Sequence, residues 1–193
     1  MMVPPHVQDV AHRVHLHLVA ERIPHAVIGG IAVGVYGYDR TTRDVDLLVN
    51  HEDLRRLPGR PLANVKGKTF KVDGVDVDVM AAPRKSELFR GIINQAVQQE
   101  GLPIIPLHGL LLLKLLSTRI SDLGDVERLL MAQSPTDVGA IRQWLRSQGV
   151  GRDIVADFDL AALSAVANRE GARTNPARKE LRDRRRKRAH PAK

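Results

Sequence analysis

Residues 27–32 read Val-Ile-Gly-Gly-Ile-Ala, and residues 40–49 read Arg-Thr-Thr-Arg-Asp-Val-Asp-Leu-Leu-Val. In the second stretch Asp44 and Asp46 alternate with apolar residues, so in a strand their side chains would share one face. The pair Gly29 and Gly30 separates a short apolar strand pattern from a helical one. Glycines at such a junction let a ligand approach the backbone, whose unpaired N–H groups attract phosphate oxygens.

A second pair of carboxylates repeats this alternation. Asp76 and Asp78 follow the turn residues Asp73 and Gly74 and are separated by valines. Neighbouring carboxylates disfavour one another's ionisation, and a divalent cation relieves that cost. Hard oxygen ligands suit Mg²⁺ or Mn²⁺. A single pair is more typical of a solvated strand face, but two pairs after a glycine turn favour a metal site.

Composition excludes several classes of protein. The chain has 193 residues and no cysteine, which excludes disulfides, thiolate metal sites and thiol catalysis. The longest apolar run is interrupted by Lys114 and is far shorter than the roughly 20 residues of a membrane span. We therefore expect a cytoplasmic protein without a membrane partner. The net charge of +8 resides after residue 170, where ten Lys or Arg residues face two acids.

The pattern of apolar residues predicts an α+β fold, with a small mixed β-sheet flanked by helices. We expect a core over residues 1–105, a helical subdomain over 106–169 and a basic, disordered tail over 170–193. The expected strands are 26–28, 45–49, 69–72, 75–80 and 102–105. The expected helices are 7–18, 31–36, 51–57, 86–99, 107–118, 123–131, 135–148 and 154–168.

The tail after Gly171 contains Leu181 as its one large apolar residue, too little to bury for independent order. Its basic residues between Arg182 and Arg188 could neutralise nucleic-acid phosphates. An RNA acceptor contacted by this tail is therefore one expected partner, although basic tails often bind without specificity.

Three motifs together resemble the nucleotidyltransferase superfamily that includes DNA polymerase beta. They are Gly-Gly-x-Ala at 29–32, Arg-x-Thr-x-Asp-x-Asp at 40–46, and Lys114 followed by Arg119, Asp122 and Asp125. They look most like the AbiEii-type branch, known mostly as toxins of type IV toxin–antitoxin pairs. The resemblance covers about residues 8–132, and the short chain and basic tail depart from it. It implies the nucleotidyltransferase fold and a nucleoside triphosphate substrate such as ATP.

The resemblance also implies roles for individual residues. Asp44 and Asp46 would bind both metal ions, and Asp78 would be the third carboxylate, with Asp76 as its alternative. Gly29 and Gly30 would hold the β and γ phosphates, while Thr42 would support the loop that carries Asp44. The cations expected at the triphosphate are Arg40, Arg43 and Lys114.

Some of these residues have a second interpretation. Arg40 and Arg43 could pair with neighbouring carboxylates, and Lys114 could lie along a core helix with its ammonium in solvent. Arg119, Asp122 and Asp125 are spaced to share one helical face, which is typical of a structural ion-pair set as well as of a cleft.

The predicted function is Mg²⁺-dependent transfer of a nucleoside monophosphate from a triphosphate to a hydroxyl of RNA, protein or a small molecule. A type IV toxin with an antitoxin partner is its narrower form. The alternative is a non-catalytic module that binds nucleotide or nucleic acid in a regulatory role.

Overall fold

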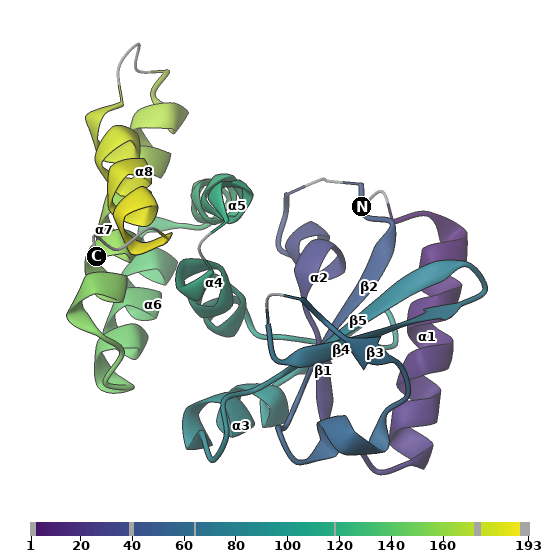
Figure 1. Ribbon diagram of the computed structural model, residues 1–193. Helices are drawn as coiled ribbons and strands as arrows, with labels where there is room; N and C mark the ends of the chain where they lie inside the picture. Colours follow the sequence, from purple (N-terminus) through teal and green to yellow (C-terminus); the bar gives the residue numbers. More distant parts are fainter. Residues whose placement is uncertain (1–2, 39–40, 64, 118, 172–174, 190–193) are drawn as a thin grey trace. The chain divides into compact units, whose positions relative to one another are not determined.

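The computed structural model describes residues 3–38, 41–63, 65–117, 119–171 and 175–189. The chain divides into two compact units, Met1–Leu110 and Leu111–Lys193 (Figure 1). The first unit contains, in chain order, α1 (Pro5–Ala20), β1 (His25–Val27), α2 (Gly29–Val35), β2 (Asp44–Val49), the 3₁₀ helix η1 (Asp53–Arg56), β3 (Arg60–Pro61), β4 (Gly67–Val72), β5 (Val75–Ala81), α3 (Glu87–Asn94), β6 (Val97–Gln99) and β7 (Leu102–Ile104). Helix α4 (Leu107–Leu116) spans the division, and α5 (Ile120–Met131), α6 (Pro135–Ser147), α7 (Arg152–Arg169) and α8 (Pro176–Ala189) follow.

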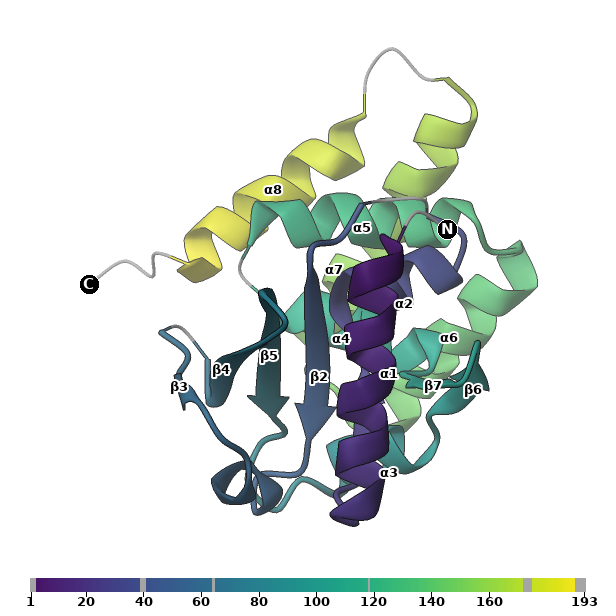
Figure 2. The same cartoon turned by 90° about the vertical axis from the view of Figure 1, so that its right-hand side faces the viewer.

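Within the described part of the first unit, seven strands form one mixed sheet in the order β3-β4-β5-β2-β1-β7-β6. The pairs β2–β5 and β1–β7 are parallel, and the other neighbours are antiparallel. Helix α1 packs against β2 and β7 and lies along the sheet (Figure 2). It does so because its apolar residues recur at helical spacing, and all of this stripe is buried: Val7, Val10, Ala11, Val14 and Leu18. The predicted α+β class with a mixed sheet is confirmed.

The turn between β4 and β5 is the predicted hairpin. Asp73 and Gly74 both have positive φ, +48° and +81°, and the flanking residues Val72 and Val75 pair directly. Positive φ at both central residues is the conformation that matches the twist of a two-residue hairpin. The hairpin therefore fixes the register of every residue on β5 against β4.

The prediction of one helix over residues 86–99 is wrong in its last third. Ser86 caps α3 by accepting a hydrogen bond from the amide of Phe89, and the helix ends at Asn94. Residues Val97–Gln99 form strand β6 instead. The reason is a second two-residue hairpin: Glu100 and Gly101 have φ of +49° and +76° and turn the chain back into β7.

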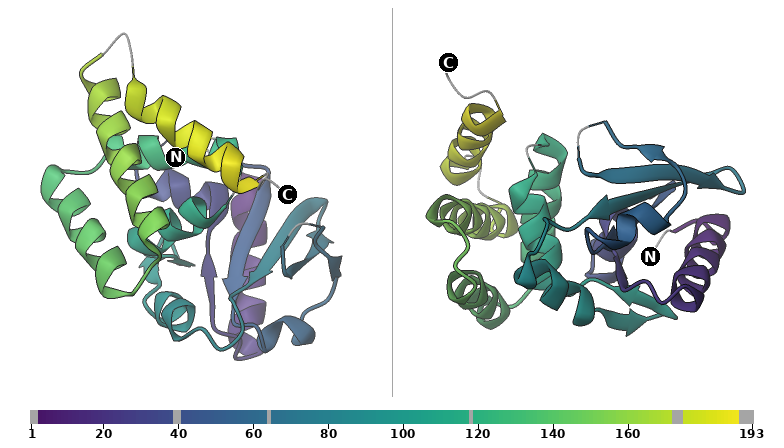
Figure 3. Two further views of the ribbon diagram at one scale, coloured as in Figure 1. Left: turned by 60° about the vertical axis from the view of Figure 1, so that its left-hand side comes forward. Right: turned by 60° about the horizontal axis from the view of Figure 1, so that its bottom comes forward.

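The second unit is helical, and its helices pack through apolar side chains. Helix α7 contacts α5, α6 and α8, and Figure 3 shows α7 and α8 side by side. Its residue Phe158 is fully buried, as are Leu129 of α5 and Leu145 of α6. Burying a side chain of this size contributes roughly 1.5–3 kcal/mol each.

The prediction that the basic tail is disordered is wrong for Pro176–Ala189, which form α8. Leu181 is fully buried, and ion pairs also join α8 to α5 and α7. Arg184 and Arg188 both bind the buried carboxylate of Asp157, each with an N–O distance of 2.7 Å. A buried carboxylate is strongly stabilised by cationic partners, and a rule based on apolar content does not register that term.

The described part of the chain contains no helix whose length and apolar content would allow it to cross a membrane.

Candidate active site

Four carboxylates lie on adjacent strands of the first unit. Strands β2 and β5 are parallel and in register, with Asp44 beside Asp76 and Asp46 beside Asp78. Neighbouring strands are about 4.8 Å apart, so paired residues present their side chains next to one another on one face. The intervening residues Val45, Leu47, Val77 and Val79 are fully buried. Burial of this apolar set fixes which face the acids occupy.

Strand β4 distinguishes the two acids of β5. Lys71 is opposite Asp76, and its ammonium binds that carboxylate at 2.9 Å. Thr69 is opposite Asp78. Asp76 is exposed, whereas Asp78 is partly buried next to Asp46. Asp76 is therefore paired with a cation, Lys71, whereas Asp78 lies beside another carboxylate, that of Asp46.

The glycine pair lies against the carboxylates of β2. A Cβ on Gly29 would overlap the carboxylate of Asp46, and a Cβ on Gly30 would be 2.5 Å from Oγ1 of Thr42. Gly29 also has a φ of +63°, which favours glycine. The amide of Ile28 donates to the carbonyl oxygen of Asp46 at 2.9 Å. Because Gly29 and Gly30 have no side chains, the junction between β1 and α2 can lie in direct contact with Asp46 and Thr42.

Thr42 orients the first carboxylate. Its side-chain hydroxyl donates to Oδ1 of Asp44 at 2.7 Å, and Thr42 is 3% exposed. The β-branched side chain of threonine is restricted at χ1, so the hydroxyl of Thr42 is held in place. Its hydrogen bond therefore restricts the rotation of the Asp44 carboxylate. This hydrogen bond is the contact through which Thr42 would support the loop that carries Asp44.

The predicted phosphate-binding arginines are placed differently. Arg43 is exposed, and no ion pair joins it to Asp44 in the described chain. Arg40 lies outside the described residues. A contact of Arg43 with phosphate stays a prediction.

The arrangement of the carboxylates indicates what kind of metal ion they could bind. Among the described residues, no group of three or more His, Asp or Glu side chains is gathered closely enough to hold one ion. Asp44, Asp46 and Asp78 therefore do not form a ready-made three-ligand cage. Mg²⁺ usually takes one or two carboxylates and completes its shell with water and substrate phosphates. The adjacent pair Asp46 and Asp78 fits that requirement, with Asp44 on the same strand face.

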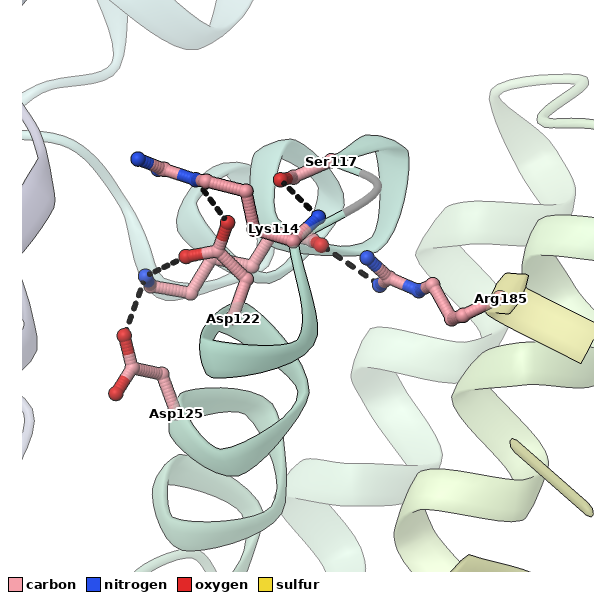
Figure 4. Close-up of polar contacts among 6 residues, drawn as sticks. Lys114, Ser117, Asp122, Asp125 and Arg185 are labelled. Carbon is pink, nitrogen blue, oxygen red and sulfur yellow. Dashed lines mark hydrogen bonds and ion pairs between the residues drawn. The ribbon is translucent and has the colours of Figure 1, made fainter. Parts of the chain in front are cut away.

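Lys114 is buried within the second unit, where Figure 4 shows its ammonium between two carboxylates. Nζ donates to Oδ1 of Asp122 at 2.9 Å and to Oδ2 of Asp125 at 2.7 Å. Arg119 Nε donates to the other oxygen of Asp122 at 3.0 Å. Neither Lys114 nor Asp122 is more than 8% exposed. The ammonium of Lys114 is therefore not solvated, and the structural ion-pair interpretation of Asp122 and Asp125 has a direct geometric basis.

The pKa of Asp122 reflects this setting. Burial would raise the pKa of its carboxyl, but the charge of Lys114 opposes burial, together with hydrogen bonds from Ser117 and Lys114 and the charge of Arg119. The favourable charges prevail, and the pKa of Asp122 lies below its ordinary value. Asp122 is therefore ionised in the folded protein and contributes to its stability. Whether Lys114 also neutralises a triphosphate stays a prediction.

Two residues near the acids were not expected from the sequence: Thr69 and Lys71. The signal that would have located them is the two-residue turn at Asp73 and Gly74. Such a turn fixes the pairing of β4 with β5, and counting back from Val72 and Val75 places Lys71 opposite Asp76.

No protein-family model and no curated protein matches the sequence. Among solved structures, a candidate nucleotidyltransferase from Thermotoga maritima is 17% identical with a TM-score of 0.47, over 76% of this chain and 96% of its own. A candidate nucleotidyltransferase from Helicobacter pylori is 13% identical with a TM-score of 0.38, over 93% of each chain. An antigenic nucleotidyltransferase-like protein from Paracoccidioides brasiliensis is 16% identical with a TM-score of 0.42, over 92% of each chain. All three TM-scores are below 0.5, so the proposals below rest on the residues of this chain.

Proposed function

We propose that the protein is a Mg²⁺-dependent nucleotidyltransferase that transfers a nucleoside monophosphate from a nucleoside triphosphate to a hydroxyl group. One observation supports this most strongly: Asp46 lies beside Asp78 on parallel strands and packs against Gly29, where no side chain intervenes. Adjacent carboxylates beside glycine backbone that carries no side chain suit a metal ion that must also meet phosphate oxygens.

The proposed reaction forms a bond from the acceptor oxygen to the α-phosphorus. The bond between that phosphorus and the oxygen leading to the β-phosphate breaks, and pyrophosphate leaves. Asp78 takes the proton of the acceptor hydroxyl. Thr42 holds Asp44 in one orientation, so that less conformational freedom is lost when substrate binds. When bound, Mg²⁺ or Mn²⁺ supplies positive charge that stabilises the phosphate oxygens.

The narrower form of this proposal is a toxin of the AbiEii-type branch that acts with an antitoxin protein. It follows from the motifs at 29–32 and 40–46 and from the set beginning at Lys114. Inducible expression in a bacterial host tests this form, because the wild type should arrest growth and the double variant Asp44→Asn, Asp46→Asn should not.

One observation favours a second function, a non-catalytic nucleotide-binding module. The described acidic side chains do not gather into a group of three, and Lys114 is already bound to Asp122 and Asp125. Such a module would bind a nucleoside triphosphate without turning it over.

Transfer of label decides between the two functions. The protein is incubated with each α-labelled nucleoside triphosphate, Mg²⁺ and a mixture of cellular RNA and protein. The double variant Asp44→Asn, Asp46→Asn is compared with Asp9→Asn, which alters a carboxylate of α1. Transfer by the wild type and Asp9→Asn, but not by the double variant, supports the transferase.

Calorimetry measures the binding of nucleoside triphosphate in the presence and absence of Mg²⁺. Binding of triphosphate that needs no Mg²⁺, without any transfer, would favour the binding module. Unchanged transfer by the double variant would refute the assigned site.

A further inference from the structure

Helix α8 uses its two faces differently. It carries eight Lys or Arg residues and only two acids. Leu181 and Arg185 are fully buried and define the inner face.

The inner-face arginines have internal partners. Arg184 and Arg188 bind Asp157, and Arg188 also approaches Asp153 at 3.2 Å. Arg185 donates to the carbonyl oxygen of Lys114 at 2.7 Å, as Figure 4 shows. These arginines are committed to the fold and are not available to a partner without cost.

The outer-face cations lack such partners. Lys179, Arg182 and Arg186 are exposed, and none has an ion pair to a residue that the structure describes. Their spacing of three and four residues places them in one row along the helix, with neighbours about 5–6 Å apart. The row extends over roughly 10 Å at a rise of about 1.5 Å per residue.

We propose that this outer row binds the phosphate backbone of double-helical RNA without reading its sequence. A row of cations fits a row of phosphates, and α8 has no aromatic residue on which an unpaired base could stack. The choice of RNA rests on the proposed function, because each nucleotide of RNA carries a 2′-hydroxyl and the transferase requires a hydroxyl acceptor.

The composition of α8 disfavours a membrane surface. A helix that lies on a bilayer inserts an apolar face, but Leu181 is the one large apolar residue of α8 and is buried against the unit. The outer face therefore offers charge without apolar area, which suits a hydrated polyanion.

The test is binding of an RNA duplex of about 20 base pairs, measured by fluorescence anisotropy over a series of salt concentrations. The triple variant Lys179→Gln, Arg182→Gln, Arg186→Gln is expected to bind on the order of tenfold or more weakly. The slope of log K against log salt should fall in magnitude by about 2–3, since roughly one ion is released per phosphate contact.

The matched control removes the same charge elsewhere, as Arg55→Gln, Arg60→Gln, Lys66→Gln, three exposed cations of the first unit. It should bind RNA like the wild type. Thermal unfolding of each variant verifies that the row, and not folding, accounts for the loss. The variant Asp44→Asn, Asp46→Asn should retain RNA binding, so failure of the transferase proposal and failure of this one are distinguishable.

Equal binding by the wild type and the α8 variant would overturn the proposal. Binding of duplex DNA or of polyglutamate as tightly as RNA would overturn the assignment to RNA. A loss confined to the α8 variant, with RNA preferred over both competitors, supports it.

Discussion

The carboxylate of Asp46 packs so closely against Gly29 that any β-carbon on the glycine would overlap it. Residue 29 is therefore restricted twice, by its φ of +63° and by the space that Asp46 occupies. The two restrictions can be separated by comparison with Gly74. Its φ is also positive, +81°, but a β-carbon added there would meet nothing within 4 Å.

We expect Gly29→Ala to destabilise the protein more than Gly74→Ala does. The positive φ costs about 1–2 kcal/mol at either position. At Gly29 the overlap adds about 1–3 kcal/mol and displaces Asp46, so nucleotidyl transfer should fall steeply. Chemical denaturation and the transfer assay measure the two effects. Equal penalties for the two variants would show that Asp46 moves aside without cost.

The two acids of β5 should differ in their importance for transfer. Asp78→Asn should abolish activity, because Asp78 lies beside Asp46, whereas Asp76→Asn should leave most of it, because Asp76 already binds Lys71. Initial rates of label transfer at saturating triphosphate provide the comparison. If Asp76→Asn were the inactive variant, the third carboxylate would have to be reassigned.

Several features of this site could be predicted from the sequence because they depend on local chain geometry. Alternation of side chains places Asp44 and Asp46 on one face, and the turn at Asp73 and Gly74 specifies the hairpin of β4 and β5. The parallel pairing of β2 with β5 has no such local signal. It joins segments about thirty residues apart, and the row of acids depends on it.

The sequence pattern does not predict helix α8, because the partners that hold it are distant in sequence. Asp157 of α7 and Glu127 of α5 are buried acids that pair with cations of α8. Arg184 binds Asp157, and Arg178 binds Glu127. A buried acid can be recognised only after its helix has been packed. Local composition therefore indicated disorder where long-range ion pairs give a helix.

Thr42 should affect both catalysis and stability. Thr42→Val keeps the shape of the side chain but removes the hydrogen bond to Asp44. The lost bond should cost about 1–2 kcal/mol in stability. Transfer should fall by about tenfold if the loosened carboxylate costs a similar amount in the transition state. Thr41→Val, at an exposed neighbouring position, is the control. Wild-type rates for Thr42→Val would argue against an orienting role.

The ion pairs of Lys114 predict a dependence of stability on pH. The pKa of Asp122 is lower in the folded protein than in the unfolded chain, so its ionisation stabilises the fold. This contribution is complete above the unfolded pKa of about 3.9 and is lost as pH falls through the folded value. Asp122→Asn should therefore cost on the order of 3 kcal/mol at neutral pH, with a smaller penalty below about pH 4.

Urea denaturation of the wild type and of Asp122→Asn between neutral and acid pH measures this dependence. Asp183→Asn, which changes an exposed acid of α8, should have little effect at any pH. A penalty for Asp122→Asn that stayed constant down to pH 3 would mean that Asp122 does not titrate in this range.

The contacts of α8 predict that the effect of Asp157→Asn on the free energy of unfolding changes sign when its arginine partners are removed. In the wild type, Asp157→Asn removes the partner of Arg184 and Arg188 and should destabilise the protein by about 3–5 kcal/mol. In the variant Arg184→Met, Arg188→Met, the carboxylate of Asp157 is left buried without these cations. There Asp157→Asn should stabilise the protein, because an amide is far less costly to bury than an unpaired charge.

A double-mutant cycle measured by urea denaturation tests this reversal. Arg186→Met is the control, since Arg186 is exposed and should not couple to Asp157. Equal penalties for Asp157→Asn in both backgrounds would show that the arginines do not neutralise it. The reversal would instead establish that α8 is held by the ion pairs of Arg184 and Arg188 with Asp157 as well as by burial of Leu181.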